Sequence, residues 1–298
     1  MSRLPHPQGL GSALRHPFIT TDFSEAQLEL ITGISQSADS CIDELTDIHR
    51  VVYEEIAEEL LWVASMPCIL DDEMDIPVGR YGSSNIGRAK TVYRNGLGHR
   101  YGKLMQTVSG IHYNFSLPKP LWPAIARAKG RQLDQSIQDQ SYFHLIRIFR
   151  RYSWLLIYLF GASPAACASF TRNREHDLDA FDEHSMYLPE ATSLRMGPLG
   201  YQSGAQSSLH VSYNSLERYA QTMVDALIRP FPAYENIGVE VDGHYRQLNT
   251  SLLQIENEFY GSIRPKRRIQ PGERPISCLL YTSPSPRDAT LSRMPSSA

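Results

Sequence analysis

Apolar residues recur at helical spacing along much of the chain and predict a largely helical framework. In the stretch 39–62, for example, Ile42, Leu45 and Ile48 begin a stripe that one face of a helix would bury. The ranges predicted as helices on this basis are 23–36, 39–62, 86–104, 134–160 and 216–228. Gly-Ala-Ser-Pro follows the fourth range and Arg-Pro follows the last, and both are signals that end a helix.

The stretch MQTVSGIHYNF, residues 105–115, has the two-residue period of a strand. Gln106, His112 and Asn114 would share one face with Gly110, and the apolar side chains would share the other. One interpretation is an ordinary antiparallel strand whose polar face meets water. The other is that the polar face lines a substrate cleft, where Gly110 lets a ligand approach the backbone.

A second strand signal lies at 237–248, where alternation surrounds Asp242 and Gly243. An Asp-Gly pair suits a type I′ hairpin turn, because both central residues of that turn need positive φ. Strands and helices are mixed rather than alternating as βαβ units, so we expect an α+β fold with an antiparallel sheet and flanking helices. The sequence contains no GxGxxG or GxxxxGK[ST] loop, which argues against a Rossmann or P-loop nucleotide site.

Composition favours a globular intracellular protein. The 298 residues are 42% hydrophobic and carry a formal charge of −3, which gives no reason to expect nucleic acid as a partner. The longest apolar run, 154–162, is too short to cross a membrane, and the N-terminus lacks the apolar region of a secretory signal. We therefore expect a cytoplasmic location and no membrane contact. The scattered cysteines suit reduced thiols and argue against structural zinc.

Residues 278–298, CLLYTSPSPRDATLSRMPSSA, differ in kind from the rest of the chain. They are rich in Ser, Pro and Arg and lack a sustained period, so they are expected to be disordered and outside the core. This tail also resembles the translation of sequencing-adapter DNA, which would make it non-native. A genuine disordered tail is the alternative.

Two acidic residues near the N-terminus have both a structural and a chemical interpretation. In a helix over 23–36, Asp22 would be the N-cap and Glu25 would complete a capping box. Asp22 and Glu29 are also almost two helical turns apart, so both could face one cation. With an imidazole from another element they would make an oxygen-rich Mg²⁺ or Mn²⁺ site.

Arginine and tyrosine occur close together in several separated segments. Arginine suits the binding of carboxylate or phosphate groups through its planar guanidinium, so the segments suggest a substrate that carries carboxylates. A surface arginine near a tyrosine is also commonplace. No GxSxG motif marks a serine nucleophile. The arginine and tyrosine pairs are Tyr93 with Arg94, Arg195 with Tyr201, and Tyr260 with Arg264.

Longer segments carry a family resemblance over residues 4–276. They are ITTDFSEAQLELIT, VYRNGLGHRYG, MQTVSGIHYNFSLP, TSLRMGPLGYQ, VDGHYRQLN and LQIENEFYGSIRPKR, in this order. Together they resemble glutamate-cysteine ligase of the proteobacterial type. The resemblance implies a glutamine-synthetase-like active site and an ATP-dependent reaction. In that reaction the γ-carboxylate of L-glutamate is phosphorylated and then attacked by the amine of L-cysteine, which is the first step of glutathione synthesis.

The resemblance also implies roles for individual residues. Metal ligands would be Asp22, Glu29 and His112, with Mg²⁺ or Mn²⁺ as the ion. His112 and Arg195 would take part in catalysis. The substrate pocket would be formed by Phe23, Tyr93, Arg94, Leu97, Gln106, Asn114, Arg195, Tyr201 and Tyr260.

The sequence departs from this family at both ends. The family carries further metal-binding acids on a strand before Met1 and a metal-binding Glu and a substrate Arg after residue 276. We therefore expect residues 1–277 to be an incomplete catalytic domain, monomeric and inactive alone. Two alternatives stay open: a related ligase that uses another amine, and a non-catalytic remnant that binds an amino acid or a nucleotide.

Overall fold

An antiparallel sheet forms the centre of the computed structural model. Its strand order is β1 (Ile19–Thr21), β2 (Gln27–Thr32), β10 (Arg287–Pro295) and β3 (Glu59–Trp62), and β4 (Ile111–Tyr113) also pairs with β10. The structure describes residues 1–70, 73–161, 163–172, 174–200, 204–266 and 287–295, the last range as backbone only.

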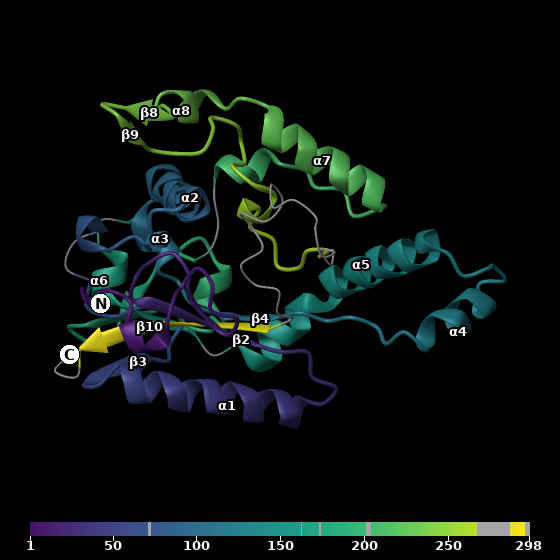
Figure 1. The fold of residues 1–298 in the computed structure, drawn as a ribbon, viewed down its shortest axis with the longest axis horizontal. Coiled ribbons are helices and arrows are strands. Elements are labelled where there is room, and N and C mark those ends of the chain that lie inside the picture. The colour runs from purple at the N-terminus through teal and green to yellow at the C-terminus, as the bar shows by residue number, and fades with distance from the viewer. Residues whose placement is uncertain (71–72, 162, 173, 201–203, 267–286, 296–298) are drawn as a thin grey trace.

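Helices cover both faces of this sheet, α1 (Ala38–Glu55) on one side and α2 (Asn85–Tyr101) with α3 (Lys103–Gln106) on the other (Figure 1). Leu28 and Leu30 of β2 pack against Ile48 and Val52 of α1 in one apolar core. Because side chains alternate along a strand, Glu29 and its neighbours two residues away belong to the opposite face, which lies toward α2.

A second core joins the long helix α5 (Gln135–Phe160) to α7 (Leu216–Ile228), where Phe143 packs near Tyr219. A three-stranded sheet and a hairpin complete the fold. The remaining helices are α4 (Leu121–Ala128), α6 (Ala168–Thr171) and α8 (Pro232–Glu235). The short strands are β5 (Ala165–Cys167), β6 (Asp179–Ala180), β7 (Ser185–Tyr187), β8 (Glu240–Val241) and β9 (His244–Tyr245). The 3₁₀ turns are η1 (Gln8–Leu10), η2 (Glu73–Asp75), η3 (Leu194–Met196), η4 (Ala205–Ser208) and η5 (Glu256–Glu258).

Three of the predicted helices and the predicted hairpin are confirmed. The helix predicted over 134–160 is α5, and its N-cap Asp134 accepts a 2.8 Å hydrogen bond from the amide of Ile137. The helix predicted over 216–228 is α7, and 86–104 is covered by α2 and α3. The predicted hairpin is β8–β9, in which Asp242 and Gly243 have φ of 53° and 76°. The mixed, antiparallel architecture is likewise as expected.

The helix predicted over 23–36 is wrong, because residues 27–32 of this segment form β2, which pairs with the preceding strand β1 in a hairpin. Asp22 lies in the turn, where its amide donates to the carbonyl of Gln27, so Asp22 and Glu25 make no capping box. The Glu25 carboxylate instead accepts hydrogen bonds from the amides of His6, at 2.8 Å, and Arg80. Apolar residues at 28, 30 and 31 fit both the helical period and the two-residue period of a strand, and pairing with neighbouring strands favours the strand.

Two further predicted elements have different bounds. The helix predicted over 39–62 ends with α1 at Glu55, after which Ala57 has a φ of 52° and β3 begins at Glu59. Of the strand predicted over 105–115, only β4 is a strand, and Gln106 ends α3 instead. The apolar residues of β4 are not packed as predicted, since Ile111 is 81% exposed.

The expected disorder of 278–298 differs from the structure over residues 287–295. These residues form β10, which pairs with β2 on one side and with β3 and β4 on the other. Strands β2 and β3 each have an edge that needs a partner, and β10 satisfies both edges. The rest of this tail lies outside the described residues.

None of the helices within the described ranges is long and apolar enough to cross a membrane.

Candidate active site

Arg195 is held against the segment that leads into β4. It lies in η3, and its Nη1 donates to the carbonyl of Ser109 at 2.5 Å and to Oγ of Ser65 at 3.4 Å. A Cβ on Gly110 would lie 2.5 Å from Cζ of Arg195. Gly110 therefore makes room for the guanidinium, whereas the sequence had suggested room for a ligand.

A line of buried amides connects Arg195 to Tyr260. From β2, Nε2 of Gln27 donates to Oγ of Ser109 at 3.4 Å and to the carbonyl of Gln106 at 3.2 Å. Nε2 of Gln106 in turn donates to the Tyr260 hydroxyl at 3.1 Å. Gln27 and Gln106 are each 0% exposed. The structure thus brings together three predicted pocket residues, Arg195, Gln106 and Tyr260, through two residues that the sequence analysis missed.

Three other predicted pocket residues form one apolar cluster. Phe23, just after β1, packs with Leu97 of α2 and with Ile76, and Tyr93 packs against this cluster from the preceding turn of α2. Tyr93 and Leu97 lie four residues apart, so they share one face of the helix. The cluster forms a hydrophobic wall that reaches α3, the helix that Gln106 ends, because Leu104 of α3 also packs against it.

Arg94 binds the backbone at Asp22. Its Nε donates to the Asp22 carbonyl, and its Nη2 donates to the carbonyl of Thr21 at 3.2 Å. The hydroxyl of Tyr81 donates to the same two carbonyls, and the guanidinium of Arg94 lies 4.5 Å above the Tyr81 ring. Arg94 thus fixes the turn that carries Asp22, and burial raises the pKa of Tyr81.

Lys90 lies one helical turn before Arg94 and was missed by the sequence analysis. It is 1% exposed, and its Nζ lies 4.1 Å from the centre of the Tyr81 ring. Within the described part of the chain Nζ has no hydrogen-bond partner. Burial, and then the positive charge of Arg94, lower the pKa of Lys90 to about 7, against the opposing charge of Glu29. The sequence signal that could have identified Lys90 is its spacing of four residues from Arg94, which places both side chains on one face of a helix.

Glu29 and His112 share one face of the central sheet, on strands that flank β10. His112 and Ile31 both oppose the same residue of β10, and Glu29 is two residues from Ile31. Carboxylate and imidazole are suitable ligands for Mg²⁺ or Mn²⁺. Among the described residues, however, no group of three or more His, Cys, Asp or Glu side chains could hold a metal ion. Asp22, Glu29 and His112 therefore do not form a metal site by themselves.

The other predicted residues are placed as follows. Asn114 comes directly after β4 and is half-buried. Arg264 donates to the carbonyls of Asn257, at 2.7 Å, and Phe259. Tyr201 lies outside the described residues.

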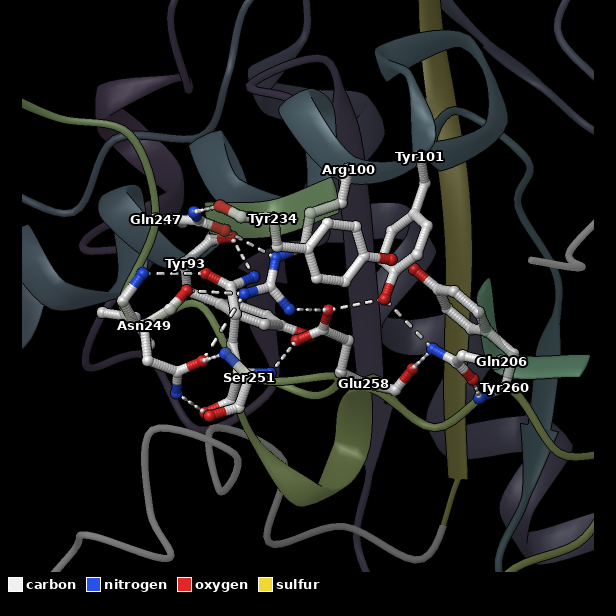
Figure 2. A network of polar contacts seen from close by, with 12 residues as sticks. Tyr93, Arg100, Tyr101, Gln206, Tyr234, Gln247, Asn249, Ser251, Glu258 and Tyr260 are labelled. Carbon is white, nitrogen blue, oxygen red and sulfur yellow. Dashed lines mark hydrogen bonds and ion pairs between the residues drawn. The ribbon is translucent and has the colours of Figure 1, made fainter. Parts of the chain in front are cut away.

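A buried ion pair joins Arg100 of α2 to Glu258 of η5 (Figure 2). Nη1 of Arg100 lies 3.0 Å from Oε1 of Glu258, and both side chains are 0% exposed. The hydroxyl of Tyr101 donates to the same Glu258 oxygen at 2.7 Å. Burial raises the pKa of Glu258, and the charge of Arg100 opposes that rise. These partners are far apart in the sequence, so no local pattern could have identified them.

A cavity of about 300 Å³ lies between the start of α2 and the β8–β9 hairpin. Arg88, Val92, Tyr245 and Leu248 are among its lining residues. It contains none of the predicted site residues. The candidate site is therefore the line from Arg195 to Tyr260, with its hydrophobic wall and the adjoining sheet face.

Replacing Gly110 with alanine is expected to displace Arg195 without unfolding the protein. The new Cβ would overlap the guanidinium, which is the far end of a flexible side chain, and the bond to Ser109 would be lost. The displaced Arg195 could no longer make its charged hydrogen bond to a carboxylate ligand, so binding of that ligand should weaken about tenfold. Calorimetric titration with L-glutamate and with L-cysteine measures this effect.

Gly204→Ala is the matched control, because a Cβ there would have no atom of the described residues within 4 Å and the backbone φ is −59°. Equal binding by Gly110→Ala and Gly204→Ala would show that the position of Arg195 does not matter for these ligands.

The fold of the chain matches those of two solved enzymes. The crystal structure of glutamate–cysteine ligase from Francisella tularensis in complex with AMP aligns with a TM-score of 0.86 and 39% identity, covering 98% of this chain and 58% of that one. A bifunctional glutathione synthetase from Pasteurella multocida aligns with a TM-score of 0.64 and 28% identity, covering 98% and 33%. The chain thus has the mixed α+β fold of this class of ligases.

Sequence comparison gives the family within that class. The family model for glutamate-cysteine ligase matches residues 1–282. Glutamate–cysteine ligase of Alcanivorax borkumensis is 56% identical over 285 residues, covering 94% of this chain and 54% of the relative. The Pseudomonas aeruginosa PAO1 enzyme is 54% identical over 276 residues, covering 92% and 52%. The chain belongs to the glutamate-cysteine ligase family, and it spans about half the length of the curated relatives it matches.

Proposed function

We propose that this chain supplies the amino-acid-binding part of an ATP-dependent ligase that joins L-glutamate to L-cysteine. The observation that carries the proposal is the buried line from Arg195 through Gln27 and Gln106 to Tyr260. It places a guanidinium, amide groups and a hydroxyl along one line, and the hydrophobic wall packs against the same helix α3 that carries Gln106. These groups suit a zwitterionic substrate with a carboxylate and a small side chain.

The proposed reaction has two steps. The γ-carboxylate of glutamate takes the terminal phosphoryl group of ATP, which gives an acyl phosphate and ADP. The amine of cysteine then attacks the acyl carbon, phosphate leaves, and γ-glutamylcysteine is formed. Arg195 would hold a substrate carboxylate in line, and Gln106 with Tyr260 would orient the amino acid, because such reactions depend on positioning. AMP in the Francisella relative supports nucleotide use.

A divalent cation, Mg²⁺ or Mn²⁺, belongs to this proposal. It would neutralise phosphate charge, and Asp22, Glu29 and His112 would contribute part of its ligand set in a glutamine-synthetase-like site. The described residues do not assemble that site, so no step of the reaction is assigned to these ligands. We propose that this chain binds the cation weakly.

Replacing Arg195 with lysine tests the function. Lysine cannot supply the planar guanidinium, so the KM for one amino-acid substrate should rise about tenfold or more while the KM for ATP stays unchanged. ADP release with ATP, glutamate, cysteine and Mg²⁺ or Mn²⁺ is the measurement, made with each substitution in a full-length version of the ligase, because residues 1–277 alone are expected to be inactive. Arg131→Lys is the control, because the exposed Arg131 side chain binds only Gln140 and Asp134 within the described ranges.

The outcomes separate this function from its alternatives. ADP release that requires cysteine supports it, and faster release with another amine indicates a related ligase. Stabilisation by glutamate or cysteine without ADP release indicates a binding role alone. Unchanged kinetics for both amino acids in Arg195→Lys would remove Arg195 from the site.

A further inference from the structure

The backbone of Tyr260 is held by Gln206, a residue of η4 that the proposed reaction does not use. The amide of Tyr260 donates to Oε1 of Gln206 at 2.9 Å. Nε2 of Gln206 donates to the carbonyl of Glu258 at 2.8 Å and to the Tyr101 hydroxyl at 3.2 Å. Gln206 is buried, at 7% exposure. Figure 2 shows its amide group between the Glu258 and Tyr260 backbone and the Tyr101 hydroxyl.

Tyr260 is also held at its ring and at its hydroxyl. Its ring meets that of Tyr101 edge to face, with centroids 5.4 Å apart. Its hydroxyl is bound to Gln106, the buried amide at the end of α3. Gln206 thus holds the backbone amide of Tyr260, Tyr101 packs against its ring, and Gln106 is hydrogen-bonded to its hydroxyl.

The ion pair of Arg100 and Glu258 gives this arrangement a rigid support. Glu258 is bound by Arg100 and Tyr101 from α2, and its Oε2 accepts from the amide of Gln254 at 2.6 Å. Gln206 binds the carbonyl of the same Glu258. The segment before Tyr260 is therefore fixed to α2 by its side chain and to η4 by its main chain.

We infer that Gln206 is a positioning residue that sets the direction of the Tyr260 hydroxyl toward Gln106, and thereby the affinity of the site for one amino-acid substrate. The inference rests on the proposed function, because it requires Tyr260 to touch that substrate. Gln206 does not act on the reacting atoms. Its amide joins η4 to the Glu258 carbonyl and to the Tyr260 amide.

Gln206→Met provides the test, because methionine keeps the length and volume of the side chain and removes the hydrogen bonds. The whole chain is titrated with L-cysteine and, separately, with L-glutamate and with ATP plus Mg²⁺, by calorimetry. The dissociation constant of one amino acid should rise about tenfold in the variant, while those of the other two ligands change less than twofold. Selectivity among ligands is the readout that general loss of stability would not produce.

Gln247→Met is the matched control. Gln247 is 0% exposed and its amide has as many partners, since Nε2 donates to the carbonyls of Tyr234 and Gly238 and Oε1 accepts from Nε of Arg100. It belongs to the same network and makes none of these bonds to Tyr260. The melting temperatures of the two variants should fall by similar amounts, while ligand affinity stays near that of the original protein in Gln247→Met.

Tyr260→Phe separates the two hypotheses. If Tyr260→Phe weakens binding of one amino acid and Gln206→Met does not, or if Gln206→Met and Gln247→Met behave alike, the positioning role is overturned and the proposed function stands. If Tyr260→Phe leaves every ligand unaffected, Tyr260 is not in the substrate site and both assignments fail at that residue. Selective weakening in Tyr260→Phe and Gln206→Met, with Gln247→Met unaffected, supports the inference.

Discussion

Replacing Arg100 with methionine is expected to lower the free energy of unfolding by about 3–5 kcal/mol, the cost of leaving one member of a buried ion pair alone. Glu258 would keep a carboxylate at 0% exposure without its cation. The carbonyl of Asn249, which accepts from Nη2 of Arg100 at 2.6 Å, would lose a donor as well. Urea unfolding followed by circular dichroism gives the measurement.

The loss should depend on pH with a defined sign. Burial already raises the pKa of Glu258, and removing the Arg100 charge removes an opposing effect, so the pKa rises further. In the folded variant Glu258 therefore keeps its proton at pH values where the unfolded chain has already released it. The stability deficit should therefore be largest above the raised folded pKa of Glu258 and shrink as the pH falls from that pKa toward 4.5, the ordinary value, below which both states are protonated.

Arg50→Met is the control for the same change of residue. Arg50 pairs with Asp47 at 2.6 Å, but the two side chains are 71% and 70% exposed. An exposed pair contributes roughly 0–1 kcal/mol, so this variant should unfold almost as the original protein does. Equal losses in the two variants would contradict the view that burial makes the Arg100 pair important.

Replacing Lys90 with methionine is expected to stabilise the fold at pH 7. The ammonium group is buried and without a hydrogen-bond partner in the described part of the chain, and its pKa is lowered to about 7. One unit of pKa corresponds to about 1.4 kcal/mol, so the charged form carries a cost of up to about 5 kcal/mol. The lost contact with the Tyr81 ring offsets part of this effect, so the free energy of unfolding should rise by roughly 2–3 kcal/mol.

The pH dependence gives the more specific result. The folded state loses the Lys90 proton near pH 7, while the unfolded chain keeps it to about pH 10.5, so the unfolded state binds more protons between these values. Stability of the original protein should gain from this group as the pH rises from 7 to 10.5, and Lys90→Met should lack that gain. The difference in unfolding free energy between the two proteins should therefore narrow as the pH rises.

Lys129→Met serves as the comparison, because Lys129 is exposed and binds Oγ of Ser141 at 3.0 Å. A similar narrowing in Lys129→Met would show that the effect of Lys90→Met does not come from burial. A Lys90→Met variant that is less stable than the original protein at pH 7 would show that the lysine has a favourable partner in solution.

Local signals in the sequence were sufficient where one element determines its own structure. Asp134 begins α5 and Asp242-Gly243 turns the hairpin because the required groups are neighbours in the chain. The segment after Asp22 could not be assigned in this way, because its strand character depends on pairing with distant residues. The period of its apolar residues was ambiguous, and the partner strand decided the outcome.

The candidate site shows the same division. Arg195, Gln106 and Tyr260 were identified through the family resemblance, and the structure brings them together. Gln106 was assigned to a strand face, although it ends a helix, because the Gly102 break before α3 was not recognised. Glu258 and Arg100 are 158 positions apart, so only tertiary structure could pair them.

The helix α2 carries parts of the site at several angular positions around its axis. Lys90 and Arg94 meet Tyr81, Leu97 packs with Phe23, and Arg100 meets Glu258. Each residue of a helix turns the next by about 100°, so these contacts depend on one shared helical phase. A single inserted residue would rotate Arg100 away from its partner while Lys90 stayed in place. The contacts of α2 therefore depend on the number of residues between its contacting side chains as strictly as on the identity of those side chains.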